Sequence, residues 1–195
     1  MRYKTVLLNE VAYDKFMEAK TALSLELNKK LSFGDLILYL AKKDITLLNI
    51  EKKLKDYILS FAEELKQTGF ISGAMLFGSI VKGTYTKQSD IDILVLTKRS
   101  FSETIGKINN ICTRFEKQAE LLYADGLPSF FSPVVLTIPE TTVFRPIYLD
   151  IVDYGVKLFD EDGSLSKFVN NQEGIRHWRE SIDGKEVLKW AANTR

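Results

Sequence analysis

Apolar and polar residues alternate along the chain in blocks that predict its helices and strands. Apolar positions recur at helical spacing in three stretches, residues 10–23, 48–67 and 102–123. Shorter apolar runs predict strands, over residues 3–8, 71–77, 91–97, 134–138 and 147–152. Pro128–Pro133 reads as a loop with Phe130 and Phe131 at an apolar tip. Because strands and helices alternate through the larger part, we expect an α/β or α+β fold with a small mixed sheet flanked by helices.

The first 43 residues form a pattern of their own. The strand over 3–8 and the helix over 10–23 precede a second helix start at Ser32–Asp35, which the apolar run Leu36–Ala41 follows. This segment is too short to build the core of a stable monomer, so it implies a partner. We therefore expect two parts, residues 1–45 and 46–195. In the tail, Trp178 and Trp190 are expected to be buried anchors.

Composition and charge exclude several classes of protein. The chain has 195 residues, 45% hydrophobic and 27% charged, with a net charge of +1, which excludes wholesale disorder and collagen-like or coiled-coil chains. A single cysteine, Cys112, cannot form an internal disulfide; it suits a small core position and a reducing cytoplasm. The single histidine, His177, reads as a surface or packing residue and leaves carboxylates as the main metal ligands. The apolar runs fall far short of the ~20 residues that a membrane span needs.

The segment Leu76–Val95 carries the most chemistry. A predicted strand ends at Gly78-Ser79, and the next strand carries Asp90 and Asp92, whose i, i+2 spacing places both carboxylates on one side. Neighbouring carboxylates repel each other unless a cation such as Mg²⁺ lies between them. Gly78 allows backbone N–H groups to approach a phosphate, and Ser79 adds a hydroxyl. Each pair alone is commonly a turn or a solvated strand end, but their order predicts phosphoryl or nucleotidyl transfer.

This segment resembles the nucleotidyltransferase superfamily of DNA polymerase beta, and most closely its minimal prokaryotic members. The signature is Gly-Ser, ten residues and Asp-x-Asp; here Ile80–Ser89 separate Ser79 from Asp90. The resemblance covers roughly residues 50–160. It implies a third carboxylate on a later strand, for which Asp150 is the candidate and Asp153 the alternative.

The resemblance also implies a mechanism and a set of ligands. Asp90, Asp92 and Asp150 would hold two Mg²⁺ ions, while an acceptor hydroxyl attacks the α-phosphate of a nucleoside triphosphate and pyrophosphate leaves. Gly78 and Ser79 would hold the β- and γ-phosphates. Lys82 and Lys87 would meet the phosphate charge, although both also read as solvated loop residues. The acceptor would be a protein, an RNA or a small molecule.

The first 43 residues resemble the ribbon-helix-helix fold of archaeal antitoxins. The matching residues are Tyr13-Asp14-Lys15-Phe16 and Ser32-Phe33-Gly34-Asp35. The resemblance implies a homodimer through residues 1–43 and a ribbon that contacts DNA through Arg2, Tyr3, Lys4 and Thr5. Residues 1–43 carry 8 Lys and Arg against 5 Asp and Glu, a small basic surplus. The ribbon could equally serve dimerisation alone.

Two functions therefore stand side by side at this level. One is a Mg²⁺-dependent nucleotidyltransferase. The other is a DNA-binding, antitoxin-like regulator whose transferase-like domain senses nucleotide or is inactive.

Overall fold

The computed structural model divides into two compact units, residues 1–41 and 42–195. It describes residues 10–26, 30–34, 36–37, 45, 48, 50–173, 175, 177–182 and 185–191.

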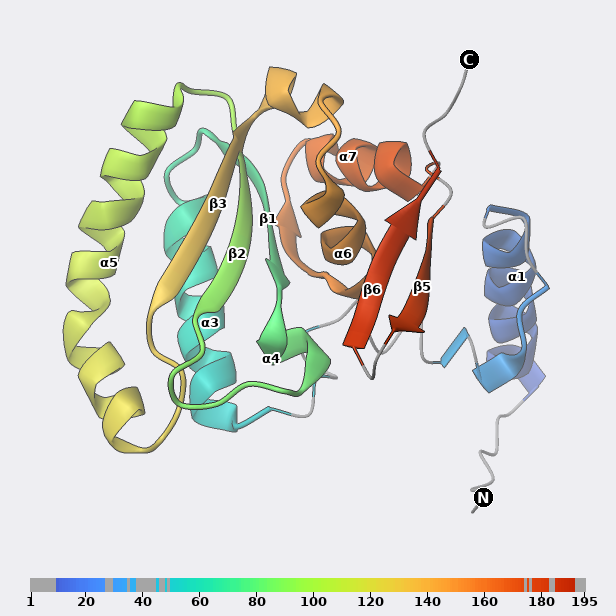
Figure 1. Cartoon of the computed structure of the whole chain (residues 1–195), viewed down its shortest axis with the longest axis horizontal. Coiled ribbons are helices and arrows are strands. Elements are labelled where there is room, and N and C mark those ends of the chain that lie inside the picture. The colour runs from blue at the N-terminus through green and yellow to red at the C-terminus, as the bar shows by residue number, and fades with distance from the viewer. Residues whose placement is uncertain are drawn as a thin grey trace. The chain divides into compact units, whose positions relative to one another are not determined.

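The second unit is built on a four-stranded sheet with strand order β3-β2-β1-β4 (Figure 1). β1 (Ile71–Phe77) pairs antiparallel with both β2 (Ile91–Thr97) and β4 (Val156–Asp160). β2 pairs in parallel with β3 (Phe131–Thr137). The helix α5 (Phe101–Ala124) connects these two strands along the chain. The fold is thus mixed α/β, as expected, and β1 and β2 have the predicted bounds.

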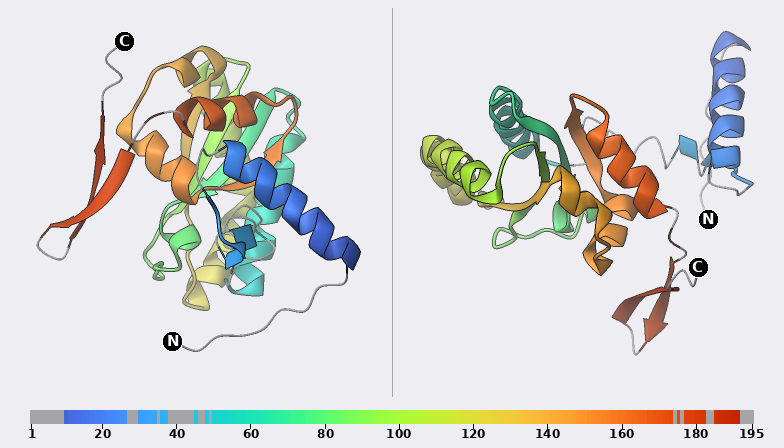
Figure 2. Two further views of the ribbon diagram at one scale, coloured as in Figure 1. Left: turned by 90° about the vertical axis from the view of Figure 1, so that its right-hand side faces the viewer. Right: turned by 90° about the horizontal axis from the view of Figure 1, so that it is seen from above.

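Helices cover both faces of this sheet (Figure 2, right). α3 (Lys52–Lys66) and α5 pack on one face, where Ile91, Ile93 and Val95 of β2 lie in their core. α6 (Pro146–Tyr154) and α7 (Ser164–Glu173) pack on the other face, against Leu94 and Leu96. Because successive strand residues point to opposite faces, β2 is apolar on both.

The segment expected to be a strand over residues 147–152 is a helix, α6. Pro146 occupies its first turn, where a missing N–H costs nothing, and Gly155 follows its last residue. The buried residues follow helical spacing: Tyr148, Leu149, Ile151 and Val152. A short apolar run rich in β-branched residues fits either period, and packing against α7 and the sheet decides it.

Two further expectations are corrected. β3 begins at Phe131, so this residue is not at a loop tip; its ring stacks on Phe61 at 3.7 Å and on Tyr57 at 4.8 Å between centroids. Phe130, one residue earlier, is 64% exposed. Trp178 and Trp190 are 42% and 41% exposed, so neither is buried. They lie on the two-stranded sheet of β5 (His177–Ile182) and β6 (Lys185–Trp190).

The first unit contains the predicted helix as α1 (Glu10–Glu26). Phe33 stacks against Phe16 at 5.7 Å and lies 5.9 Å from the Tyr13 ring, so the aromatic residues of the antitoxin-like motif pack together. The strand expected over residues 3–8 and most of the run Leu36–Ala41 lie outside the described residues. In the second unit, a 3-10 turn, η2 (Ile138–Thr142), follows β3. None of the described helices is both long and apolar enough to cross a membrane.

Candidate functional site

Gly78 ends β1 in a backbone conformation that other residues avoid. Its φ is 77° and its ψ is −150°, close to a region that is essentially restricted to glycine. The four-residue helix α4 (Ser79–Lys82) follows, and Gly83 ends it in the left-handed conformation. The Gly-Ser pair therefore forms a tight turn at the end of a buried strand, as the sequence predicts.

Asp92 packs directly against this turn. Phe77 and Asp92 are partners in the antiparallel pairing of β1 with β2. A Cβ atom added to Gly78 would lie 2.1 Å from Oδ2 of Asp92. The absence of a side chain at Gly78 is therefore what leaves room for the Asp92 carboxylate beside the turn.

Asp90 and Asp92 form the expected carboxylate pair. Asp90 is exposed and immediately precedes β2, whereas Asp92 is half-buried on the strand. Burial raises the pKa of Asp92, the nearby Asp90 charge raises it further, and a hydrogen bond from Ser132 opposes both. A hard divalent cation would suit this pair, because its charge would offset both the cost of burying a carboxylate and the repulsion between the two carboxylates.

Ser132 is the residue that the sequence reasoning did not identify. It is the second residue of β3 and the partner of Asp92 in the parallel register of β2 with β3. Its side chain opposes the rise in the pKa of Asp92. The strand beside Asp92 thus carries a neutral hydroxyl at the position nearest the carboxylate pair. Its place beside Asp92 depends on the parallel register of β2 with β3, which no local sequence pattern reveals.

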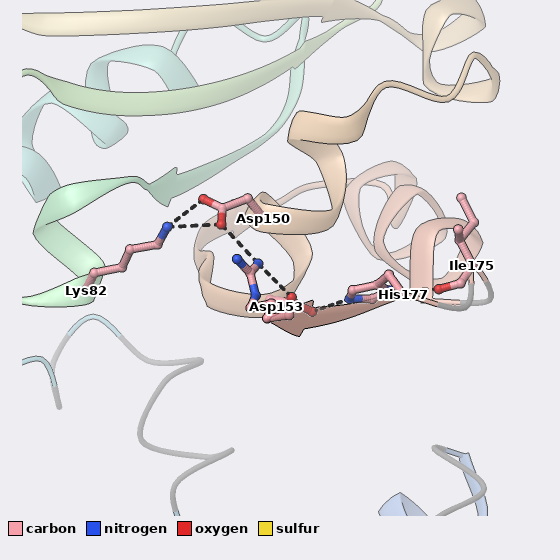
Figure 3. A network of polar contacts seen from close by, with 6 residues as sticks. Lys82, Asp150, Asp153, Ile175 and His177 are labelled. Carbon is pink, nitrogen blue, oxygen red and sulfur yellow. Dashed lines mark hydrogen bonds and ion pairs between the residues drawn. The ribbon is translucent and has the colours of Figure 1, made fainter. Parts of the chain in front are cut away.

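Asp150 lies on α6 and contacts cations. Lys82 Nζ donates to both of its oxygens, at 3.0 Å to Oδ1 and 2.8 Å to Oδ2 (Figure 3). Nη2 of Arg179, on β5, donates to Oδ1 at 3.0 Å. Among the described residues, no three His, Cys, Asp or Glu side chains are grouped so that they could hold one metal ion. The structure therefore does not gather Asp150 with Asp90 and Asp92 in such a group.

The polar network continues from Arg179 to His177. Asp153 accepts from Nη2 of Arg179 at 2.9 Å and from Nε2 of His177 at 2.8 Å, and Nδ1 of His177 donates to the carbonyl of Ile175 at 2.7 Å (Figure 3). Burial lowers the pKa of His177, but these two hydrogen bonds and the Asp153 charge outweigh it, and the pKa is raised. Both partners of the ring only accept, so the imidazolium satisfies both. His177 is thus a packing residue with a specific partner.

Lys87, the other lysine expected to bind phosphate, has a different environment. Its Nζ lies 3.9 Å from the centroid of the Tyr123 ring, on α5. Tyr123 in turn lies beside Phe130, with 6.4 Å between ring centroids. Lys82, at the end of the short helix that follows Gly78, is the lysine that contacts Asp150.

The chain is similar to several known proteins. The family model of the nucleotidyltransferase domain matches residues 56–187. A candidate protein adenylyltransferase of Methanocaldococcus jannaschii is 36% identical over 67 residues, which cover 34% of this chain and 61% of that protein. The crystal structure of a toxin–antitoxin with AMP-PNP matches at 15% identity and a TM-score of 0.39, over 58% of this chain and 82% of the other.

The family match takes in the Gly78–Ser79 turn, Asp90 and Asp92, Ser132, α6 and the first strand of the hairpin. It extends over more than half of the chain. The chain therefore belongs to the nucleotidyltransferase domain family.

Proposed function

We propose that this protein uses Mg²⁺ to transfer a nucleoside monophosphate from a nucleoside triphosphate to an acceptor hydroxyl. The observation that carries the proposal is the packing of the Asp92 carboxylate against Gly78. It brings the carboxylate pair, which suits a cation, and the turn at Gly78 to the same end of β1 and β2. A metal-bound triphosphate needs both features next to each other.

Each residue of the site has a definite task in this proposal. Asp90 and Asp92 would hold Mg²⁺, with phosphate oxygens completing its ligands, because the described residues group two carboxylates here and not three. When bound, the ion would draw charge from the phosphate oxygens during transfer. Gly78 and Ser79 would receive the β- and γ-phosphates, and Lys82 would neutralise part of their charge. The second ion expected from the resemblance remains a prediction, and Asp150, the residue expected to hold it, is contacted by two cations.

The bonds exchanged in the reaction are simple. The acceptor oxygen forms a bond to the α-phosphorus while the bond from that phosphorus to the bridging oxygen breaks, and pyrophosphate leaves. The acceptor proton passes to solvent. Ser132, the strand partner of Asp92, would help to keep this carboxylate ionised, because it opposes the rise in its pKa. The name of the Methanocaldococcus relative makes a protein hydroxyl the first acceptor to test and ATP the first donor.

The test is transfer of label from α-labelled ATP. Purified protein is incubated with Mg²⁺, labelled ATP and whole-cell lysate, and the labelled products and released pyrophosphate are identified. We expect Asp92→Asn to abolish both signals while the fold is retained. Asp125→Asn is the matched control, since Asp125 forms an exposed ion pair with Lys53 away from β1 and β2. Transfer by Asp92→Asn at the rate of the unmodified protein would refute the proposal, and nucleotide binding without pyrophosphate release would favour a regulator.

We also propose that residues 1–43 bring two chains together. Tyr13, Leu25 and Ile37 are large apolar residues exposed in the first unit, with 46%, 78% and 42% of their surface accessible. Such residues suit an intermolecular contact. Arg2, Tyr3, Lys4 and Thr5, proposed to contact DNA, lie outside the described residues. Light scattering at micromolar concentration should give the mass of a dimer; a monomer would contradict the ribbon-helix-helix interpretation.

A further inference from the structure

Two cations from distant parts of the chain meet at one carboxylate. Lys82 ends α4, three residues after Ser79, and Arg179 lies on the β5–β6 hairpin; both donate to Asp150 (Figure 3). The same two cations also lie over one ring, each 4.7 Å from the centroid of Tyr154. The side chains are partly accessible, at 32% for Lys82, 21% for Asp150 and 19% for Arg179.

The contacts of Asp150 with two positively charged side chains disfavour a metal ion at this carboxylate. Both oxygens of Asp150 already accept hydrogen bonds from positively charged groups. A divalent cation bound to this carboxylate would lie within a few ångströms of two positive charges, and like charges at that separation repel strongly. The pair Asp90 and Asp92 has the opposite character, because there the repulsion is between two negative charges.

The position of Lys82 links this cluster to the turn that follows β1. Lys82 is one helical turn beyond Ser79, and its N–H bonds back to the carbonyl of Gly78. Arg179 reaches the same cluster from β5 and is held there a second time by Asp153. Arginine and lysine are the side chains that bind phosphate oxygens most strongly, arginine through a planar fork and lysine as a point charge.

We propose that Asp150 is a positioning residue that holds Lys82 and Arg179 side by side as the two cations for the terminal phosphates of the nucleotide. This inference rests on the proposed function and deepens it in two respects. Asp150 acts through the phosphate-binding cations and not through a metal ion. The β5–β6 hairpin, which lies outside the four-stranded sheet, is part of the nucleotide site because it supplies Arg179.

The test is equilibrium binding of ATP and of AMP to the full-length protein in Mg²⁺, by calorimetry. In Asp150→Asn we expect the ATP dissociation constant to rise about tenfold or more, because a charge-assisted contact is lost, while that of AMP is unchanged. A residue that only supported the fold would change both constants together. Lys82→Met and Arg179→Gln should show the same selective loss. The triple variant Lys82→Met/Arg179→Gln/Asp150→Asn should bind ATP no more weakly than the double variant Lys82→Met/Arg179→Gln, since Asp150 acts through these two cations.

The Mg²⁺ dependence separates a positioning residue from a metal ligand. The Mg²⁺ concentration that half-saturates ATP binding should be unchanged in Asp150→Asn and raised in Asp92→Asn. A raised Mg²⁺ requirement in Asp150→Asn, a further loss of ATP binding in the triple variant, or equal weakening of ATP and AMP binding would overturn the inference. Asp125→Asn is the control, with an exposed ion pair removed and ATP binding expected at the unmodified level.

Failure of this inference can be told apart from failure of the proposed function. If the unmodified protein bound no ATP in Mg²⁺, both would fall. If the unmodified protein bound ATP, Asp92→Asn lost ATP binding and Asp150→Asn kept it, the proposed function would stand and the positioning role of Asp150 would be wrong. Melting temperatures of all variants show whether each remains folded during the measurement.

Discussion

Asp92 of β2 and Ser132 of β3 are partners in the parallel strand pair, and the Ser132 side chain opposes the rise in the pKa of Asp92. The strand beside the carboxylate pair therefore contributes a neutral oxygen. An ion held by Asp90 and Asp92 would find two negative protein ligands at this place, and oxygens of the nucleotide would complete its coordination.

Replacing this serine with aspartate should create a third carboxylate. Ser132→Asp places a further negative charge beside Asp92, so we expect the protein to be less stable without metal, because the like charges repel. We also expect added Mg²⁺ to raise the melting temperature of Ser132→Asp more than that of the unmodified protein. Thermal unfolding with and without Mg²⁺ measures both effects. Ser102→Asp, on the exposed start of α5, is the control for an added surface charge.

The stability of the protein should depend on pH through Asp92. Burial and the Asp90 charge raise its pKa above the ordinary value of 3.8, so the folded protein binds this proton more tightly than the unfolded chain does. The resulting stabilisation is complete below the unfolded pKa and is lost as the pH rises through the folded pKa. Asp92→Asn should thus be more stable than the unmodified protein at neutral pH without metal, with the difference vanishing in acid. Denaturant unfolding across this range measures it; equal stabilities at neutral pH would contradict the electrostatic argument.

Gly78 should tolerate no side chain. Gly78→Ala introduces both a disfavoured backbone conformation and a Cβ 2.1 Å from Oδ2 of Asp92, so we expect a loss of more than ~3 kcal/mol in the free energy of unfolding. Gly83→Ala is the matched variant. Gly83 also has a positive φ, of 69°, but nothing lies within 4 Å of an added Cβ, and the cost should be ~1–2 kcal/mol. Chemical denaturation measures both. Similar losses at the two positions would show that backbone conformation, and not the contact with Asp92, sets the requirement for glycine.

The single histidine makes the hairpin contact easy to follow. His177 should titrate with a pKa above 6.5, because its hydrogen bonds with Ile175 and Asp153 and the Asp153 charge outweigh burial and the Arg179 charge. Its stabilising effect is complete below the unfolded pKa and is lost as the pH rises through the folded pKa. An NMR titration of the one imidazole gives this value directly. Asp153→Asn should lower it and Asp125→Asn should not; no change in Asp153→Asn would contradict the ion pair.

Several parts of the fold follow from the sequence because they depend on local spacing. The bounds of β1 and β2, the helices α1, α3 and α5, and the Gly78–Ser79 turn are set by periodic apolar residues and by glycine. The i, i+2 spacing of Asp90 and Asp92 predicts that their charges act on each other, and the Asp90 charge does raise the pKa of Asp92. The membership of the nucleotidyltransferase domain family was likewise visible in the spacing from Gly78-Ser79 to Asp90.

Other features depend on contacts between distant segments. The run around Asp150 fits a strand or a helix equally well, and only packing against the sheet and α7 makes it α6. Tryptophan side chains are commonly buried, but Trp178 and Trp190 lie on a two-stranded hairpin that leaves both exposed. Lys82, Asp150 and Arg179 are separated by dozens of residues, so no local pattern could bring them together.

The sequence by itself therefore determined the turn, the carboxylate pair and the family. The tertiary structure alone decided what surrounds them: Ser132 beside Asp92, through the register of two parallel strands, and two cations at Asp150, through the docking of α6 and the hairpin. The physical reason is that strand and helix periods act over a few residues, whereas strand register and side-chain clustering are settled only when the whole core packs.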